Sequence, residues 1–384
     1  MNRIMDSLNA RSKILAVPFG AGLLALPFTG AGKALAVFAV ACAAVLLHRV
    51  YGTVAVAAFR SSAADRLARL RSFPATLAPS LRSFAALAIM SAIILILPLM
   101  LNDYYRDILT LTGMYIVLAL GLNIIVGQAG LLNLGYVAFY AVGAYTYAIL
   151  STQFGLSFWP GLFVGALTAA VTAALLGFVT LRLRGDYFAI VTLGLGEITR
   201  IVLNNWVSLT GGPNGISKIG RPMINGHVLS STLDFYYLIV FIVAVTIYAV
   251  HRLMFSRIGR AWIAIREDEV AAEAMGIDTF RLKLLAFVLG SAWAGLAGVF
   301  FAAKMAFVSP ESFTFFESVM ILCMVVLGGM GSIPGIILGA FLLIALPEVF
   351  RDFQDYRMLA FGTALVLMMI FRPQGLLGTV KKTA

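Results

Sequence analysis

Charged residues are scarce in this sequence and make up only 12% of its 384 residues. A soluble domain usually carries about 25% charged residues, which keep its surface in contact with water. Hydrophobic residues make up 61% of this chain, and its mean hydropathy is +0.98. The shortage of charge excludes a soluble globular protein, because so much apolar surface must face lipid.

Cysteine and histidine are also scarce. The two cysteines, Cys42 and Cys323, lie far apart inside apolar runs, so they indicate buried small side chains rather than a disulfide framework. The three histidines, His48, His227 and His251, are scattered and show neither metal-ligand spacing nor a catalytic triad. We therefore expect this chain to have no catalytic residues, no metal site and no enzymatic activity.

Motifs for nucleotide binding are missing as well. Gly32-Lys33 is followed by Ala34 and lacks the upstream glycine of a phosphate-binding loop, and Gly194-Leu-Gly196 lacks the third glycine of a dinucleotide fingerprint. The net charge of +11 is not gathered into a basic patch with interleaved aromatic residues, which argues against nucleic-acid binding. We expect the chain to bind no cofactor, so any ATP hydrolysis linked to its function would take place on other subunits.

The sequence is rich in apolar stretches of about 17 to 25 residues, the length that crosses a bilayer. The candidate spans are 14–31, 34–50, 84–101, 108–126, 131–151, 160–181, 187–206, 235–254, 283–303, 316–330, 334–350 and 357–371. The short tenth and eleventh stretches could instead be re-entrant. The 36 glycines suit close packing of helices. This pattern predicts an all-α, polytopic transmembrane helical bundle of about 10–12 spans.

Basic residues predict the orientation of this bundle. The loop between the second and third spans should be cytoplasmic because only Asp65 opposes its arginines, which are Arg60, Arg66, Arg69, Arg71 and Arg82. Alternation from this loop places both termini in the cytoplasm. The first span could instead be a cleaved signal peptide, since Ala34-Leu35-Ala36 has the spacing of a cleavage site. We divide the chain into an N-terminal extension, 1–83, with two spans and a basic connector, and a transmembrane domain, 84–384.

Polar residues first interrupt the apolar chain between Gly121 and Gly135, where Asn123, Gln128 and Asn133 lie among glycines. Glycines permit a helix to break, and an unwound turn would offer backbone groups to a polar substrate, as in many membrane transporters. The three amide side chains are therefore candidates for a substrate pathway. A tight turn whose amides bond neighbouring helices explains the same spacing equally well.

Two further interruptions are candidates for the pathway. Glu197 and Arg200 lie three residues apart and can pair, either as a self-neutralised pair near the bundle interior or as part of the pathway. The outer loop from Leu209 predicts a rigid turn with positive φ angles. This loop could gate the outer mouth, dock a delivering protein, or be an ordinary surface turn. Its candidate residues are Thr210, Gly211, Gly212 and Asn214.

The cytoplasmic stretch 266–276 predicts a short amphipathic helix. Acidic residues near its start favour the positive end of the helix, Gly276 supplies a left-handed stop, and Asp278 caps the next span. Such a helix could fit a groove on a cytoplasmic partner, or it could be a solvated connector. The residues of this candidate coupling helix are Arg266, Glu269, Ala272, Glu273, Ala274 and Gly276.

Four segments in combination resemble one known family. They are Gly121–Gly135, Leu183–Leu193, Leu209–Ile216 and Ser256–Asp278. Over residues 105–375 the chain is similar to the LivM-type permease subunits of high-affinity branched-chain amino acid ABC importers. Its first hundred residues look like the N-terminal extension of the longer family members.

The resemblance implies a function and a set of partners. The chain would be the pore subunit that translocates leucine, isoleucine or valine across the bacterial inner membrane by alternating access. It would work with a second, LivH-like permease, two cytoplasmic ATPase subunits that bind ATP, and a periplasmic amino-acid-binding protein. The stretch 266–276 would be the helix that couples the ATPases to the pore.

Other functions stay open at this point. Permeases for urea or short amides have similar motifs. An ion-coupled secondary transporter would need a buried acidic residue, for which Glu197 is the candidate. A membrane-embedded enzyme or scaffold is disfavoured, because the sequence shows no catalytic constellation.

Overall fold

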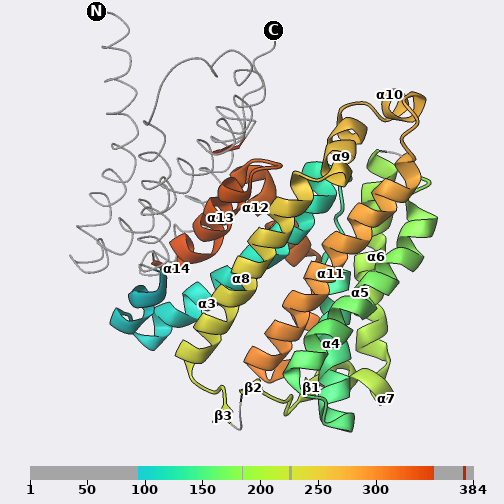
Figure 1. Cartoon of the computed structure of the whole chain (residues 1–384). Coiled ribbons are helices and arrows are strands. Elements are labelled where there is room, and N and C mark those ends of the chain that lie inside the picture. The colour runs from blue at the N-terminus through green and yellow to red at the C-terminus, as the bar shows by residue number, and fades with distance from the viewer. Residues whose placement is uncertain (1–93, 184, 225–226, 350–374, 378–384) are drawn as a thin grey trace, which may run out of the picture. The chain divides into compact units, whose positions relative to one another are not determined.

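The computed structural model of the protein describes residues 94–183, 185–224, 227–349 and 375–377 (Figure 1). The chain divides into two units, Met1–Leu101 and Asn102–Ala384. The predicted extension 1–83, with its spans 14–31 and 34–50, lies outside the described residues, as does the predicted span 357–371, so these stay predictions. In the first unit, residues 94–100 are helical within the predicted span 84–101.

The described part of the second unit is built from helices. In chain order they are α3 (Asp103–Asn123), the π-helix η1 (Ile124–Gln128), α4 (Val137–Phe154), α5 (Phe158–Thr180), α6 (Asp186–Asn205), α7 (Val207–Thr210), the 3₁₀ turn η2 (Gly212–Asn214), α8 (Thr232–Met254), α9 (Arg257–Glu267), α10 (Glu269–Ala274), α11 (Thr279–Met305), the 3₁₀ turn η3 (Pro310–Ser312), α12 (Phe315–Gly328), α13 (Ile333–Ala340), the π-helix η4 (Phe341–Ala345) and α14 (Leu346–Val349).

Strands in the described residues are limited to two short antiparallel pairs. β1 (Ile216–Ser217) pairs with β4 (Phe307–Val308), with Ile216 opposite Val308. β2 (Met223–Ile224) pairs with β3 (His227–Val228). These pairs close loops between helices, so the described residues form the helical bundle that the sequence predicts.

Five described helical segments are long and apolar enough to cross a membrane: Asp103–Gln128, Phe158–Thr180, Thr232–Met254, Thr279–Met305 and Pro310–Gly328. α4 and α6 fall on the predicted spans 131–151 and 187–206. The prediction of a helix from residue 131 was wrong, because residues 129–136 are not helical and α4 begins at Val137. The helix that ends with η1 cannot continue through this segment, because Gly130 has a φ angle of +73°, which breaks the right-handed helix.

The core of the second unit is centred on α3 and α11. In α3 the most apolar window is 89% buried, whereas that of α5 is only 22% buried, so α3 is central and α5 peripheral. α11 packs against α3, α4 and α5. Glycines bring these helices together: a Cβ at Gly143 of α4 would lie 2.2 Å from the carbonyl oxygen of Gly295 in α11. A Cβ at Gly295 would in turn lie 2.5 Å from the carbonyl oxygen of Gly165 in α5.

The two ends of this bundle carry different elements. Figure 1 shows α9 and α10 at one end, and α7 with β1, β2 and β3 at the opposite end. We call these the inner end and the outer end, after the predicted orientation. The predicted coupling helix and the predicted outer loop therefore lie at opposite ends, as the alternation of loops requires.

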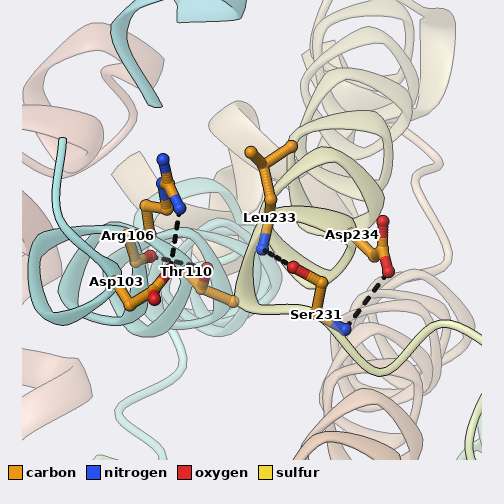
Figure 2. A network of polar contacts seen from close by, with 6 residues as sticks. All are labelled: Asp103, Arg106, Thr110, Ser231, Leu233 and Asp234. Atoms are coloured by element: carbon orange, nitrogen blue, oxygen red, sulfur yellow. Dashed lines mark hydrogen bonds and ion pairs between the residues drawn. The ribbon is translucent and has the colours of Figure 1, made fainter. Parts of the chain in front are cut away.

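α3 and α8 both begin at the outer end. Ser231 caps α8, because its hydroxyl accepts a hydrogen bond from the Leu233 amide and its own amide donates one to the Asp234 carboxylate (Figure 2). At the start of α3, Arg106 pairs with Asp103 at 2.7 Å. Gly113 of α3 packs against Ile239 of α8, so the two helices run side by side in the same direction.

The glycine contact between α4 and α11 gives the first prediction. Gly143→Val should lower the free energy of unfolding by about 1–3 kcal/mol, because its side chain meets the backbone of α11, which cannot move aside cheaply. Gly194→Ala in α6 is the matched control, since no atom lies within 4 Å of a Cβ there. Denaturant unfolding in detergent micelles measures both variants, and equal unfolding curves would contradict the packing described.

Candidate functional site

The predicted break after α3 is present and consists of a π-helix followed by a non-helical segment. α3 passes into the π-helix η1, and the chain then runs without helix through residues 129–136. Asn123 and Gln128 at either end of this π-helix are buried. π-helical turns often lie at functional sites, since the extra residue loosens the regular hydrogen-bond ladder.

The turn between α12 and α13 meets this π-helix. The amide of Gly331 donates a hydrogen bond of 2.8 Å to Asn123 Oδ1, which joins residues 208 positions apart. A Cβ at Gly127 would lie 1.9 Å from the same oxygen, so only glycine fits there. Asn123 Nδ2 and Gln128 Oε1 have no hydrogen-bond partner among the described residues. Two buried amide groups therefore have unused bonding capacity at this point.

Arg266 reaches the same place from α9. Its Nη1 donates a hydrogen bond to the carbonyl oxygen of Gly127. Its aliphatic stem packs closely on Gly130, because a Cβ at that position would lie only 2.7 Å from Arg266 Cγ. Gly331 lies close to both side chains, because a Cβ at Gly331 would be 3.5 Å from Gln128 Nε2 and 3.8 Å from Arg266 Nη1. We call this cluster the inner junction, and its residues are Asn123, Gly127, Gln128, Arg266 and Gly331.

Asn133 does not belong to the inner junction. Its side-chain oxygen accepts a hydrogen bond of 2.9 Å from the Gly135 amide, a local turn that the sequence interpretation had left open. The neighbouring Leu134 amide donates to Thr192 Oγ1 of α6 at 3.2 Å. The non-helical segment 129–136 is therefore fastened to α6, and the three predicted amides divide between two places.

Glu197 and Arg200 form the local pair that their spacing predicts. Arg200 Nε donates to Glu197 Oε1 at 2.9 Å, and the side chains are 34% exposed for Arg200 and 38% for Glu197. Of the two alternatives, the described residues do not show a pair near the bundle interior, because both side chains lie on a half-exposed face of α6. The inward face of α6 instead uses the small Gly196 and the buried Thr192 to approach segment 129–136.

The outer loop has the rigid turn that was predicted. Gly211, Gly212 and Gly215 have φ angles of +76°, +58° and +66°. The buried Thr210 hydroxyl donates to the Leu203 carbonyl at 2.6 Å and accepts from the Gly212 amide at 3.2 Å. Thr210, Gly211, Gly212 and Asn214 thus lie near β1 at the outer end, and the structure does not bring them to the inner junction.

The predicted coupling helix is shorter than expected. α10 begins at Glu269, because Asp268 breaks away from α9 and caps α10 by accepting from the Val270 and Ala271 amides at 2.9 and 3.0 Å. Arg266 therefore belongs to α9, which corrects the prediction of one helix from 266. The left-handed stop at Gly276, with a φ angle of +82°, and the cap by Asp278 agree with the prediction.

α10 is fixed on one side and open on the other. Ala272 is buried, and Glu269 forms an ion pair of 2.5 Å with Lys283 of α11. Val270 and Met275 are 69% and 83% exposed, and Ala271, Glu273 and Ala274 are exposed as well. The helix thus presents small and apolar side chains away from the bundle at the inner end.

Sequence reasoning missed Glu317 in the first turn of α12. Its carboxylate accepts a hydrogen bond of 2.7 Å from the buried Tyr115 hydroxyl of α3. The available signal was a lone acidic residue inside the predicted span 316–330. It also missed the ion pair of 2.8 Å between Lys304 and Asp107, which brings together two residues that appear unrelated in sequence.

A search of the described residues finds no group of three or more His, Cys, Asp or Glu side chains able to hold a metal ion. The site residues are amides, one arginine and backbone groups. Such groups can hold a polar or zwitterionic solute by hydrogen bonds, but they offer no nucleophile with an adjacent base.

Comparisons with known proteins agree with this geometry. Residues 104–371 match the family described as "Branched-chain amino acid transport system / permease component". The permease protein LivM of the high-affinity branched-chain amino acid transport system of Escherichia coli is 50% identical over 303 residues, 73% of this chain and 71% of that protein. LivM of Salmonella typhimurium is 49% identical over the same shares.

More distant relatives are also permeases. LivH of Escherichia coli is 28% identical over 291 residues, which cover 70% of this chain and 92% of LivH. No solved structure matches. The family match covers more than half of the chain and includes the inner junction, α10 and Glu317. The chain therefore belongs to the family of permease components of branched-chain amino acid transport systems.

Proposed function

We propose that this chain is the LivM-type pore subunit of an ATP-driven importer that carries leucine, isoleucine and valine across the bacterial inner membrane by alternating access. In this proposal both termini are cytoplasmic, the chain binds no cofactor, and ATP is hydrolysed on partner subunits. The names of the relatives at 50% and 49% identity support the substrate class.

The proposed partners are a second permease, two cytoplasmic ATPases and a periplasmic amino-acid-binding protein. The chain is similar to both LivM and LivH of Escherichia coli, which supports a pair of related permeases packed about a pseudo-two-fold axis. The rigid outer turn around Gly211 suits contact with the binding protein, because its fixed backbone presents N–H and C=O groups at the outer end.

The observation that carries the proposal is the exposed apolar side of α10. Val270 and Met275 are exposed at the inner end, where the predicted orientation places water rather than lipid. Apolar side chains gathered on a short, well-capped helix are typical of a surface that inserts into a groove on a partner. A cytoplasmic ATPase is the partner that this location fits.

A direct route connects α10 to the bundle. The Glu269–Lys283 ion pair fastens α10 to α11, and Trp262 of α9 donates a hydrogen bond of 2.7 Å to the Leu282 carbonyl. One turn further along α9, Arg266 holds the Gly127 carbonyl in η1. A push on α10 would therefore reach the inner junction through rigid, hydrogen-bonded elements, which is the mechanical coupling that we propose.

We choose the central pathway residues of the proposal from the buried amide groups that have no hydrogen-bond partner among the described residues. When the inner junction opens, Asn123 Nδ2 and Gln128 Oε1 are free to bond the carboxylate or ammonium group of the passing amino acid. Asn133 lies in segment 129–136, which contacts α6, and Glu197 lies on α6 itself. Thr210, Gly211, Gly212 and Asn214 lie at the outer entrance. Their contact with substrate is part of the proposal.

Isolation of the complex tests the proposed function. We expect the tagged chain, purified in mild detergent from its native host, to bring down a second permease and ATPase subunits. The reconstituted complex should take up leucine only with ATP and the binding protein. A chain that purifies alone and takes up solute along an ion gradient would contradict the importer. Uptake of urea but not of leucine would contradict the proposed substrate and would indicate a urea permease.

A charge on the exposed side of α10 tests docking of the ATPase. Val270→Asp should reduce the ATPase recovered with the purified permeases at least fivefold, because a carboxylate must lose its water when the helix enters a groove. Arg257→Gln, at the exposed start of α9, is the control. Full ATPase recovery with Val270→Asp would mean that this side of α10 is not the docking surface.

Removal of the Arg266 contact tests coupling. A hydrogen bond to a charged group is worth about 1.5–3 kcal/mol, so Arg266→Ala should lower leucine uptake per ATP hydrolysed by roughly tenfold or more. ATPase activity and recovery of the complex should persist. Arg257→Ala, an exposed arginine on the same helix, is the matched control. The same uptake per ATP in both variants would exclude this route.

A further inference from the structure

Among the described residues, the outward side of α5 and that of α6 with α12 differ in chemistry. The exposed side chains of α5 are entirely apolar, as expected for contact with lipid, and include Phe163, Leu167, Val171, Leu175 and Phe178. The face formed by α6 and α12, which contact one another, carries the half-exposed Glu197, Arg200 and Glu317. Charged side chains are costly against lipid, so this face adjoins protein or water.

Glu317 lies at a depth well below the outer end of the bundle. Its partner Tyr115 is twelve residues after Asp103, the first residue of α3, which places it about 18 Å along that helix. At the other end of α12, the following turn reaches Asn123 through Gly331. α12 therefore begins partway across the membrane and runs to the inner end.

Within the part of the chain that the structure describes, the carboxylate of Glu317 has a neutral partner and no cation. Tyr115 donates to Oε2 alone, which leaves Oε1 available. Among the described residues, Glu317 takes part in none of the ion pairs. By contrast, Glu197 is paired with Arg200, and Asp107 with Lys304. A carboxylate at this depth is stable in its charged form only when a cation or water neutralises it.

The surroundings of Glu317 are rigid and aromatic. The ring of Phe313, just before α12, lies 5.0 Å from that of Tyr140, whose hydroxyl is 3.6 Å from the sulfur of Met114 beside Tyr115. Tyr145 also packs on Phe313, and its buried hydroxyl has no partner among the described residues. Phe316, next to Glu317, is 78% exposed. An accessible apolar side chain thus directly precedes the carboxylate on α12.

We propose that Glu317 binds the ammonium group of the transported amino acid on its way through the membrane, while Phe316 contacts its aliphatic side chain. A free branched-chain amino acid carries these two features, a cation and an apolar group, within a few ångströms of each other. The inference rests on the proposed import of branched-chain amino acids. It places the path along the face of α6 and α12, where the second permease would complete it.

Charge removal at Glu317 tests this inference in the reconstituted complex. Glu317→Gln can still accept the Tyr115 hydrogen bond but has no charge, so leucine uptake should fall at least tenfold. Glu317→Asp should restore part of the uptake. Recovery of both permeases and the ATPase activity stimulated by leucine-loaded binding protein should persist. Glu311→Gln, an exposed carboxylate in η3, is the matched control and should transport normally.

The outcomes separate the two proposals. ATP-dependent leucine uptake by the unchanged complex tests the importer itself, before any variant is made. Once that uptake has been measured, normal transport by Glu317→Gln would overturn the proposal that Glu317 binds the ammonium group. Loss of the second permease from purified Glu317→Gln would also overturn it, because Glu317 would then hold the subunits together. Equal losses in Glu317→Gln and Glu317→Asp would show that its geometry, rather than its charge, matters.

Discussion

No water is available to backbone amides inside a bilayer, and this constraint decides where the helices of this chain can break. Segment 129–136 leaves helical geometry at membrane depth, and its backbone is satisfied by Thr192 and by a local turn around Asn133. The turn after α12 is satisfied by Asn123, and the end of η1 by Arg266. Several buried polar side chains among the described residues therefore lie where helices end inside the bundle.

These hydrogen bonds connect each helix break to a neighbouring helix. A helix interrupted in lipid would be unstable, but each interruption here is joined to a different helix: α6, the α12–α13 turn, or α9. Movement of one element must therefore move the others or break a hydrogen bond in a low dielectric. Glycines permit this close arrangement, since Gly127 leaves no space for a side chain beside Asn123. The exposed α10 is thus connected to the interior of the bundle.

The same constraint distinguishes the outward faces. α5 can contact lipid because its outward residues are apolar, whereas α6 and α12 carry carboxylates and an arginine that lipid would not stabilise. The central position of α3 follows from its contacts with α8, α11, α12 and α13, which bury nearly its whole apolar length. This difference is the reason for the proposal that a second permease covers the face of α6 and α12.

The sequence by itself determined the local features. Hydropathy located the segments that became α3, α5, α8 and α11 to within a few residues, because length and apolar content are properties of one stretch of chain. Capping chemistry located the end of α10 at Gly276 and the start of α11 at Asp278 for the same reason. The pairing of Glu197 with Arg200 is also local, since both lie on one turn of helix.

Only the tertiary structure decided which polar residues meet. Asn123 bonds a residue 208 positions away, and Glu317 one 202 positions away. Apolar helices in lipid carry no sequence pattern that names their neighbours, because packing depends on the matching of surfaces. The assignment of Asn123 and Gln128 to one place and Asn133 to another therefore required the folded chain. So did the recognition of Glu317, whose significance comes from its depth and from the lack of a cation among the described residues around it.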